Sequence, residues 1–242
     1  MSPRSPIGDF DFWYAVNNTE IPLMPMRRLE TFGATMIYYH MLSEPMDAVR
    51  QTRIREGRIQ AYQPQILTPA SFANAILEGF GPEAEAYANW LREHTQDLHI
   101  LRYGFHIRKE EIREHLVHEP IEVIKPQVVE QAQKSPHPMT AVVAGVDHPW
   151  EVSLIKLMAD VIRYSAPGNV RDLARRKLLD DDGGLPRAVR EELDRDFLAA
   201  SRNPRLIKAL GRKLQQFGVF EEYQDRFFSL VRAHREDAGE SP

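Results

Sequence analysis

Asp147 and His148 form a candidate catalytic pair. They follow an apolar, β-prone run at residues 140–146 and precede Pro149. An adjacent carboxylate and imidazole can work as a general acid and base, and ligands collect at the carboxyl ends of strands in sheets with parallel strands. The competing interpretation is that one of the two residues caps the helix that follows the proline. The pair is therefore either an acid/base site or a helix cap.

A possible metal site lies in the segment KEEIREHLVHE, residues 109–119. If this segment is a helix, the i, i+4, i+7 spacing of Glu111, His115 and His118 puts a carboxylate and two imidazoles on one side. Zinc, manganese and iron accept such ligands. However, Pro120 would fray the turn that carries the last histidine, and no rigid fourth ligand is present. We expect a solvated helix face here, with no metal and no cofactor.

Three arginines in the segment QTRIREGRIQA, residues 51–61, form a candidate anion-binding group. The sequence predicts a β-hairpin that closes at residues 56–57, where the glycine can adopt a positive φ. A two-residue loop would place Arg53, Arg55 and Arg58 on one face. Opposed like charges destabilise a hairpin, so an anion should offset them. That anion is either a carboxylate of the chain or an external phosphate, which guanidinium groups bind through two hydrogen bonds.

The segment at residues 219–234 carries candidate interface residues. Its apolar side chains recur at helical spacing, and the stripe is wider than one neighbouring helix covers. Gly218 separates it from the amphipathic segment 204–217 and favours a tight reversal between two helices. The sequence predicts an antiparallel helix pair whose aromatic side chains contact a protein partner or a second copy of the chain. The candidate interface residues are Phe220, Tyr223, Phe227, Phe228 and Val231.

Segment 204–217 is also basic on the side opposite its apolar residues. A basic helix can contact phosphates, which makes nucleic acid an alternative partner. The next helix would occupy the place of a recognition helix, but its first turns are rich in carboxylates, which repel the nucleic-acid backbone. The basic residues of the segment are Arg205, Lys208, Arg212 and Lys213.

Strands that could position these residues are expected mainly before residue 147. Apolar and polar alternation and continuous β-prone runs are typical of strands. Pro22 and Pro25 restrict the second strand to a sheet edge, and apolar residues on both faces make the third one central. Helices between the last two strands indicate a crossover in a partly parallel sheet. Besides the hairpin, strands are expected at residues 10–16, 19–24, 35–42, 99–107 and 140–146.

Helices are expected throughout the remainder of the chain. The Thr68-Pro69 pair is a helix-start signal, and the sequence SAPGN at residues 165–169 should end the deeply buried helix that starts at residue 150. The expected helices cover residues 68–79, 82–96, 109–118, 121–133, 150–164, 170–179, 187–200, 204–217 and 219–234.

These patterns predict the α+β class. We expect an α+β core domain at residues 1–146, with a mixed sheet and packed helices, and an all-helical region at 147–242 packed on it. The two together could also form one continuous domain. The 43% hydrophobic content of the 242 residues is enough for a packed core.

Composition narrows the function. The net charge of −4 gives no global attraction to nucleic acid or to an anionic membrane. The absence of cysteine excludes disulfides, thiolate metal sites and thiol nucleophiles, and it suits the cytoplasm. No apolar run is long enough for a membrane span, and no dinucleotide, P-loop, zincin or hydrolase-elbow motif occurs. We expect a non-catalytic protein-interaction or assembly subunit, with polyanion binding and an acid/base enzyme as alternatives.

Overall fold

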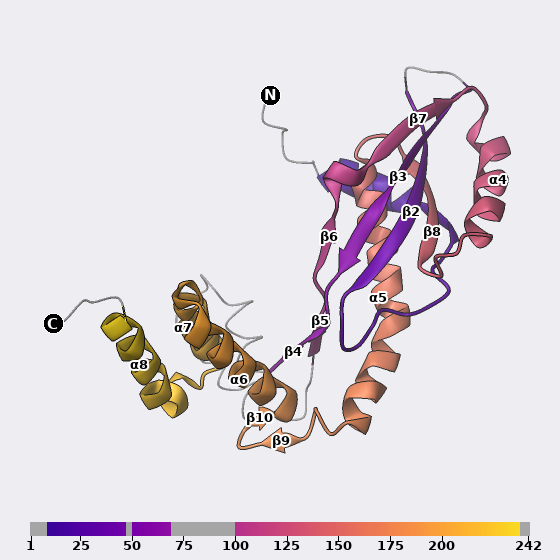
Figure 1. Ribbon diagram of the computed structural model, residues 1–242. Helices are drawn as coiled ribbons and strands as arrows, with labels where there is room; N and C mark the ends of the chain where they lie inside the picture. The colour runs from indigo at the N-terminus through magenta and orange to yellow at the C-terminus, as the bar shows by residue number, and fades with distance from the viewer. Residues whose placement is uncertain (1–8, 47–49, 69–99, 238–242) are drawn as a thin grey trace. The chain divides into compact units, whose positions relative to one another are not determined.

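The computed structural model describes residues 9–46, 50–68 and 100–237 (Figure 1). A mixed sheet in the N-terminal half and helices in the C-terminal region make this an α+β protein, as the sequence predicts. Contacts divide the chain into two units, residues 1–64 with 103–172 and residues 65–102 with 173–242. The division does not follow the expected boundary at residue 146, and whether each unit is a domain of its own stays a prediction.

The first unit contains a six-stranded sheet in the order β1-β8-β2-β3-β6, with β7 also paired to β3. Strands β2 and β8 are parallel, and the other pairs are antiparallel. The predictions of an edge strand near residue 20, a central strand after residue 35 and a strand at 140–146 are confirmed. The strands are β1 (Glu20–Leu23), β2 (Thr35–Glu44), β3 (Thr52–Ala61), β6 (Phe105–Ile107), β7 (Arg113–Val117) and β8 (Thr140–Val146).

The predicted hairpin at residues 51–61 is wrong, because this segment is the single strand β3, paired with β2 along its length. Gly57 lies opposite Tyr39 in mid-strand, and a Cβ atom there would stand 2.5 Å from the Tyr39 hydroxyl. The glycine therefore makes room for a buried ring and closes no turn. Side chains alternate along a strand, so Arg53 and Arg55 lie on one face of the sheet and Arg58 on the other.

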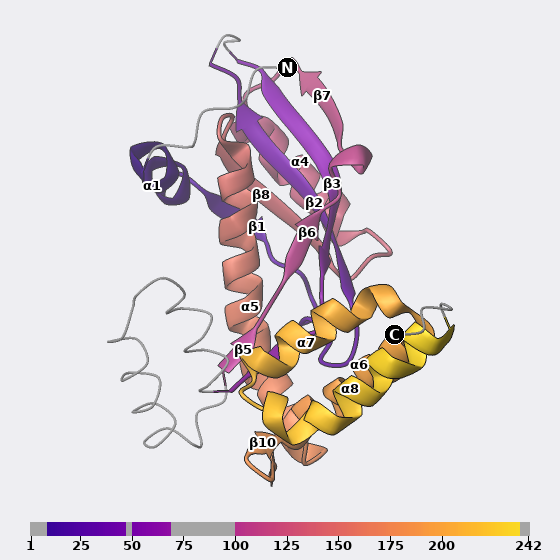
Figure 2. The same cartoon turned by 90° about the vertical axis from the view of Figure 1, so that its left-hand side faces the viewer.

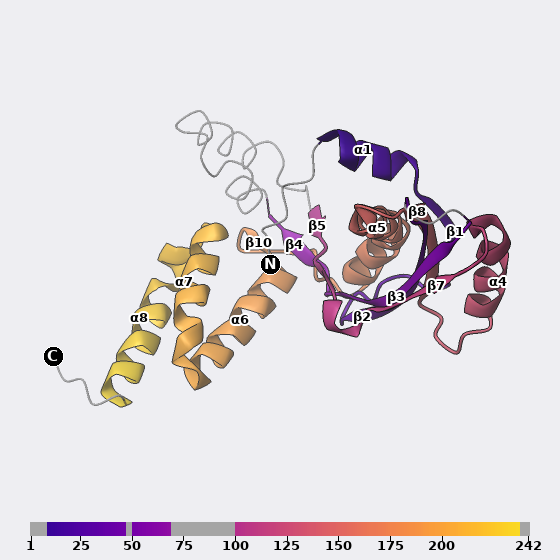
Figure 3. The same cartoon turned by 90° about the horizontal axis from the view of Figure 1, so that it is seen from above.

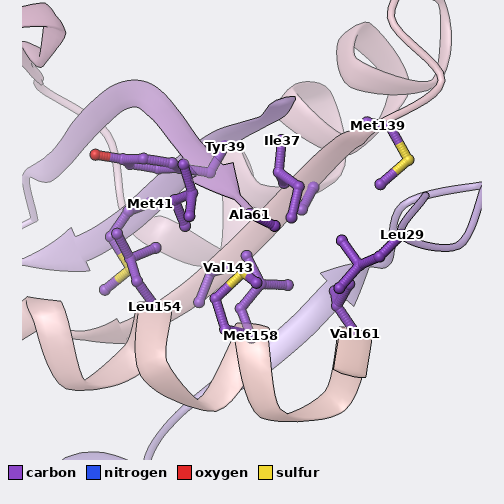
Figure 4. Close-up of a cluster of buried hydrophobic side chains, with 13 residues drawn as sticks. Leu29, Ile37, Tyr39, Met41, Ala61, Met139, Val143, Leu154, Met158 and Val161 are labelled. Carbon is purple, nitrogen blue, oxygen red and sulfur yellow. The ribbon is translucent and has the colours of Figure 1, made fainter. Parts of the chain in front are cut away.

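Two helices cover opposite faces of this sheet. Helix α5 (Trp150–Arg175) runs along the face that carries Tyr39 and Met41, and Figures 2 and 4 show it packed there. Helix α4 (Ile121–Gln133), predicted from the sequence, covers the other face near Leu42. The sheet is therefore apolar on both sides where the helices lie, which explains why β2 and β8 are nearly continuous apolar runs.

The expected strand at residues 10–16 is wrong. These residues form part of helix α1 (Asp9–Asn17). The aromatic run has no consistent polar face. At the end of α1, the side chains of Asn18 and Thr19 donate hydrogen bonds to the carbonyls of Tyr14 and Ala15, four residues earlier. These bonds satisfy carbonyls that a helix end leaves without partners.

Helix α5 continues through residues 165–169, where the sequence predicts a break. Ser165 Oγ donates to the Val161 carbonyl and accepts from the Leu29 amide. Gly168 leaves room for Arg28, whose Nη1 would stand 2.7 Å from a Cβ atom there. The small residues of this segment therefore serve close packing of the loop at residues 28–31 against the helix.

The expected helix at residues 109–118 is absent. Lys109–Glu111 form a single 3₁₀ turn, η1, and β7 follows as a strand paired with β3. An amphipathic segment can satisfy its backbone hydrogen-bonding groups either in a helix or by pairing with the open edge of a sheet. Here the segment pairs with the edge of β3 and forms a strand. The expected strand at 99–107 is divided into β5 (Ile100–Arg102) and β6, which belong to different units. The helices expected between residues 68 and 96 fall almost entirely outside the described residues.

Among the described residues of the second unit are three packed helices, all predicted from the sequence, which lie side by side in Figure 3. Gly218 has a φ of 71°, and the amides of Gly218 and Val219 donate to the carbonyls of Gln215 and Leu214. This pattern ends the second helix and reverses the chain, as expected. The elements are β4 (Gln65–Leu67), β5, β9 (Asp181–Asp182), β10 (Leu185–Pro186), α6 (Arg187–Arg202), η2 (Pro204–Leu206), α7 (Ile207–Gln216) and α8 (Phe220–Asp237).

Candidate functional site

Asp147 lies in a cluster of charged side chains where the parallel strands β2 and β8 end. Its Oδ1 atom accepts hydrogen bonds from Ser43 Oγ at 2.8 Å and from Arg55 Nη2 at 2.9 Å. Its Oδ2 atom accepts one from Arg53 Nη1. Two of the predicted anion-binding arginines and the predicted catalytic carboxylate therefore bind one another.

Arg55 is the most deeply buried charged residue of this cluster, with 5% of its surface exposed. Its Nε donates to Glu114 Oε2 at 2.8 Å, and its guanidinium carbon stands 5.2 Å from the centre of the Trp150 ring. Glu114 also pairs with Arg53, at 3.2 Å. A buried cation is tolerated only when its donors are matched in this way. The arrangement supports a structural role for both arginines.

The electrostatics of the cluster keep Asp147 ionised. Burial raises the pKa of this carboxyl, but the hydrogen bonds from Ser43 and Arg55 and the charges of Arg55 and Arg53 outweigh burial, so the pKa lies below its usual value. A carboxylate with a lowered pKa is a weak base. His148 is exposed beside it. The geometry therefore favours stabilisation of the sheet end over acid/base chemistry at this pair.

Arg58 lies on the opposite face of the sheet, 3.1 Å from Glu111 Oε2 and over the Tyr38 ring. Each of the three arginines thus has a carboxylate partner inside the chain. The shared arginine face on which the anion-binding hypothesis depended is absent, because no hairpin forms.

The three residues of the possible metal site do not share a helix face. Glu111 belongs to the η1 turn, His115 lies on β7 opposite Ile54, and His118 follows that strand. Their sequence spacing therefore no longer places them on one side of a helix. In the part of the chain that the structure describes, no group of three or more histidine, aspartate and glutamate side chains is arranged to hold a metal ion.

The predicted interface residues of α8 divide into an inner and an outer set. Phe220, Tyr223 and Phe227 pack against the core of the second unit. Val231 is half-buried. Phe228 remains 44% exposed, and its ring makes edge contacts with those of Phe220 and Phe227 at centroid distances of 6.2 and 5.8 Å. Phe228 is thus the outermost member of a three-ring cluster.

The charged side chains of α8 also divide into two groups. Glu222 pairs with Arg190 at 2.6 Å, and Arg226 pairs with Asp194 at 2.5 Å, so these residues fix α8 to α6. Asp225 and Arg232 form no ion pair within the described residues. Their charges are available to a partner.

The basic side of α7 is partly neutralised within the chain. Lys213 donates to Glu192 at 2.5 Å and to Asp196. Arg205, Lys208 and Arg212 are exposed. Arg212 lines a cavity of about 390 Å³ together with Arg102. Because Lys213 is paired with two carboxylates, α7 presents fewer unpaired cations than its sequence indicates.

A second site, which sequence reasoning missed, lies in the first unit. A cavity of about 540 Å³ is lined by side chains of β2, β3 and the loop before β8, among them Tyr38, His40, Glu56, Arg58 and His137. The signal was the spacing of Tyr38 with His40 and of Glu56 with Arg58, two residues apart on paired strands. Interpreting residues 51–61 as a hairpin concealed it, because the register of β3 against β2 brings these side chains together.

Comparison with protein-family models, with curated proteins and with solved structures gave no match. Among the helices described, none combines the length and the apolar character needed to cross a membrane. The functional argument therefore depends on the geometry of the chain itself.

Proposed function

We propose that this chain is a non-catalytic protein-interaction or assembly subunit, and that α6, α7 and α8 act as a small helical bundle through which two copies associate. The observation that carries the proposal is the exposed ring of Phe228 in the middle of α8. Large aromatic side chains that remain in water at the centre of a helix are typical anchors of protein interfaces.

The charges of α8 indicate which partner fits. Asp225, Phe228 and Arg232 are exposed and lie at i, i+3 and i+7, so they share one side of the helix. The midpoint of α8 falls between residues 228 and 229. If two copies of α8 pair antiparallel about this midpoint, Asp225 of each copy lies opposite Arg232 of the other, and the two phenylalanines meet at the centre. A two-fold interface needs a patch that is complementary to itself, and this side of the helix has that property.

The test is the mass of the purified protein in solution, measured by light scattering over a range of concentrations. We expect a monomer–dimer equilibrium in the micromolar range, because one helix pair is smaller than a standard interface. Phe228→Ser should shift the equilibrium to monomer without loss of helicity. Ile155→Ser is the matched control, since it removes an exposed apolar side chain from α5.

Charge reversal tests the proposed geometry. Asp225→Arg and Arg232→Asp should each weaken the dimer through like-charge contacts, and the double variant should restore it because the pairs re-form with exchanged signs. A wild-type protein that stays monomeric at every concentration overturns self-association. If neither single charge reversal weakens the dimer, the antiparallel α8 pairing is wrong.

The alternative functions have less support. Polyanion binding loses the arginine hairpin and one of the four basic side chains of α7, since Lys213 is held by Glu192 and Asp196. An acid/base site at Asp147 would need a carboxylate that is free of its two arginine partners. We also propose that the protein is cytoplasmic, because the absence of cysteine suits that compartment.

A further inference from the structure

The sheet face opposite α5 is only partly covered by α4. Helix α4 packs over the part of this face that carries Leu42, Ile54 and Val142. Farther along β2 and β3, the same face lines the cavity of about 540 Å³. This volume is within the range of sites that hold small molecules, roughly 300–1,000 Å³.

A histidine and a glutamate form a fixed pair in this cavity. His40 and Glu56 lie directly opposite each other on β2 and β3, and His40 Nδ1 is 2.9 Å from Glu56 Oε1. A carboxylate at Nδ1 assigns the ring proton of the neutral imidazole to that nitrogen and leaves the lone pair on Nε2. The second oxygen of Glu56 has no partner within the described residues. The pair therefore offers two acceptors to a ligand with N–H groups.

Two rings stacked face to face line the same cavity as this pair. Tyr38 and His137 have ring centroids 4.1 Å apart and an angle of 11° between their planes. The guanidinium of Arg58 lies over the Tyr38 ring, 5.5 Å from its centroid. His137 itself is exposed. A stacked aromatic pair of this kind is a platform for another planar ring.

The charges around the cavity select against phosphate. Three carboxylates line it, Glu56, Glu110 and Glu111, against the two arginines Arg58 and Arg113. Arg58 is already paired with Glu111. An excess of one negative charge repels a polyanion, whereas a neutral ligand is unaffected by it.

We propose that this cavity binds a neutral, planar heteroaromatic molecule of the nucleobase class. The ring stacks on the Tyr38–His137 pair, and its N–H edge donates to His40 Nε2 and to the free oxygen of Glu56. The site is distinct from the α8 surface and does not depend on self-association.

Isothermal titration of the full chain with adenosine, guanosine, cytidine and uridine tests this inference, with ribose as the probe that lacks a base. At least one nucleoside should bind saturably and ribose should not. Tyr38→Leu, which removes the ring and keeps an apolar side chain, should weaken binding roughly tenfold. Tyr164→Leu, at an exposed tyrosine of α5 that does not line the cavity, should leave binding unchanged.

Glu56→Gln supplies a second variant that keeps the shape of the side chain, so the test stands if Tyr38→Leu fails to fold. It should also weaken binding, because the amide keeps only one acceptor oxygen, so that either the partner of His40 or the acceptor for the ligand is replaced by an N–H donor. The nucleoside 5′-monophosphates should bind no more tightly than the nucleosides. The inference is overturned if no nucleoside binds the folded protein, if both variants bind like the wild type, or if the monophosphate binds much more tightly in a salt-dependent manner.

Discussion

The two units of this protein place their charged side chains in different ways. In the sheet unit, Asp147 bonds to Arg55 and Arg53, which lie 92 and 94 positions away in the sequence, and the guanidinium of Arg55 is buried. In the helical unit, Arg226 bonds to Asp194 only 32 positions away, and both side chains are largely exposed. The Asp147 cluster therefore holds distant strands of the sheet unit together, whereas the Arg226–Asp194 pair lies on the surface of the helical unit.

The largest effect should follow the loss of the carboxylate that binds the buried Arg55. Asp147→Ala leaves Arg53 and Arg55 with Glu114 alone of the two carboxylates that they share. Removal of one member of a buried ion pair destabilises a protein by about 3–5 kcal/mol, and because Glu114 remains we expect a loss of about 3 kcal/mol. Chemical denaturation measures this change. Asp194→Ala, the matched control in the helical unit, should lower stability by at most about 0.5 kcal/mol. Equal losses for the two variants would contradict the comparison.

A smaller loss is expected for Gly57→Ala. The added Cβ would stand 2.5 Å from the Tyr39 hydroxyl and 2.8 Å from Cζ of its ring, so the buried ring must move. Overpacking of this kind destabilises by about 1–3 kcal/mol. In the background of Tyr39→Phe, which removes the hydroxyl, the same substitution should be better tolerated. If residues 51–61 were instead a hairpin with Gly57 in the turn, Gly57→Ala would cost the same stability with and without the Tyr39 hydroxyl.

The smallest expected effect is a loss of stability at acid pH. The pKa of Asp147 lies below its ordinary value of 3.8, so its stabilising contribution is present above that pH and is lost as the pH falls through the lowered pKa. Stability measured from neutral pH downward should therefore decline more steeply for the wild type than for Asp147→Asn below about pH 4. Parallel profiles for the two proteins would show that the carboxylate has the same pKa in the folded and unfolded chains.

Prediction from sequence succeeded where the signals were local. The expected helices at 187–200, 204–217 and 219–234 correspond to α6, η2 with α7, and α8. Gly218 ends α7 through hydrogen bonds that span only three to five residues, as its position predicts. Capping and helical periodicity act within one or two turns, so the sequence contains everything they need.

Prediction failed where an element depends on a distant neighbour. Residues 113–117 are amphipathic and suit either a helix or a strand, and the edge of β3 decides for the strand. The break expected at residues 165–169 became continuous helix, because Arg28 and Leu29 use its small residues for packing. The cavity was missed for the same reason, since the pairing of His40 with Glu56 is a matter of register.

The sequence by itself determined the α+β class, the central and edge strands β2 and β1, the C-terminal helices and the reversal at Gly218. Only the tertiary structure decided that Gly57 accommodates a ring, that Arg53 and Arg55 bind Asp147, and that Arg58 faces away from them. The physical reason is the range of the interactions. A helix satisfies its backbone within four residues, whereas a strand takes its partners, its register and the environment of each side chain from segments far away in the chain.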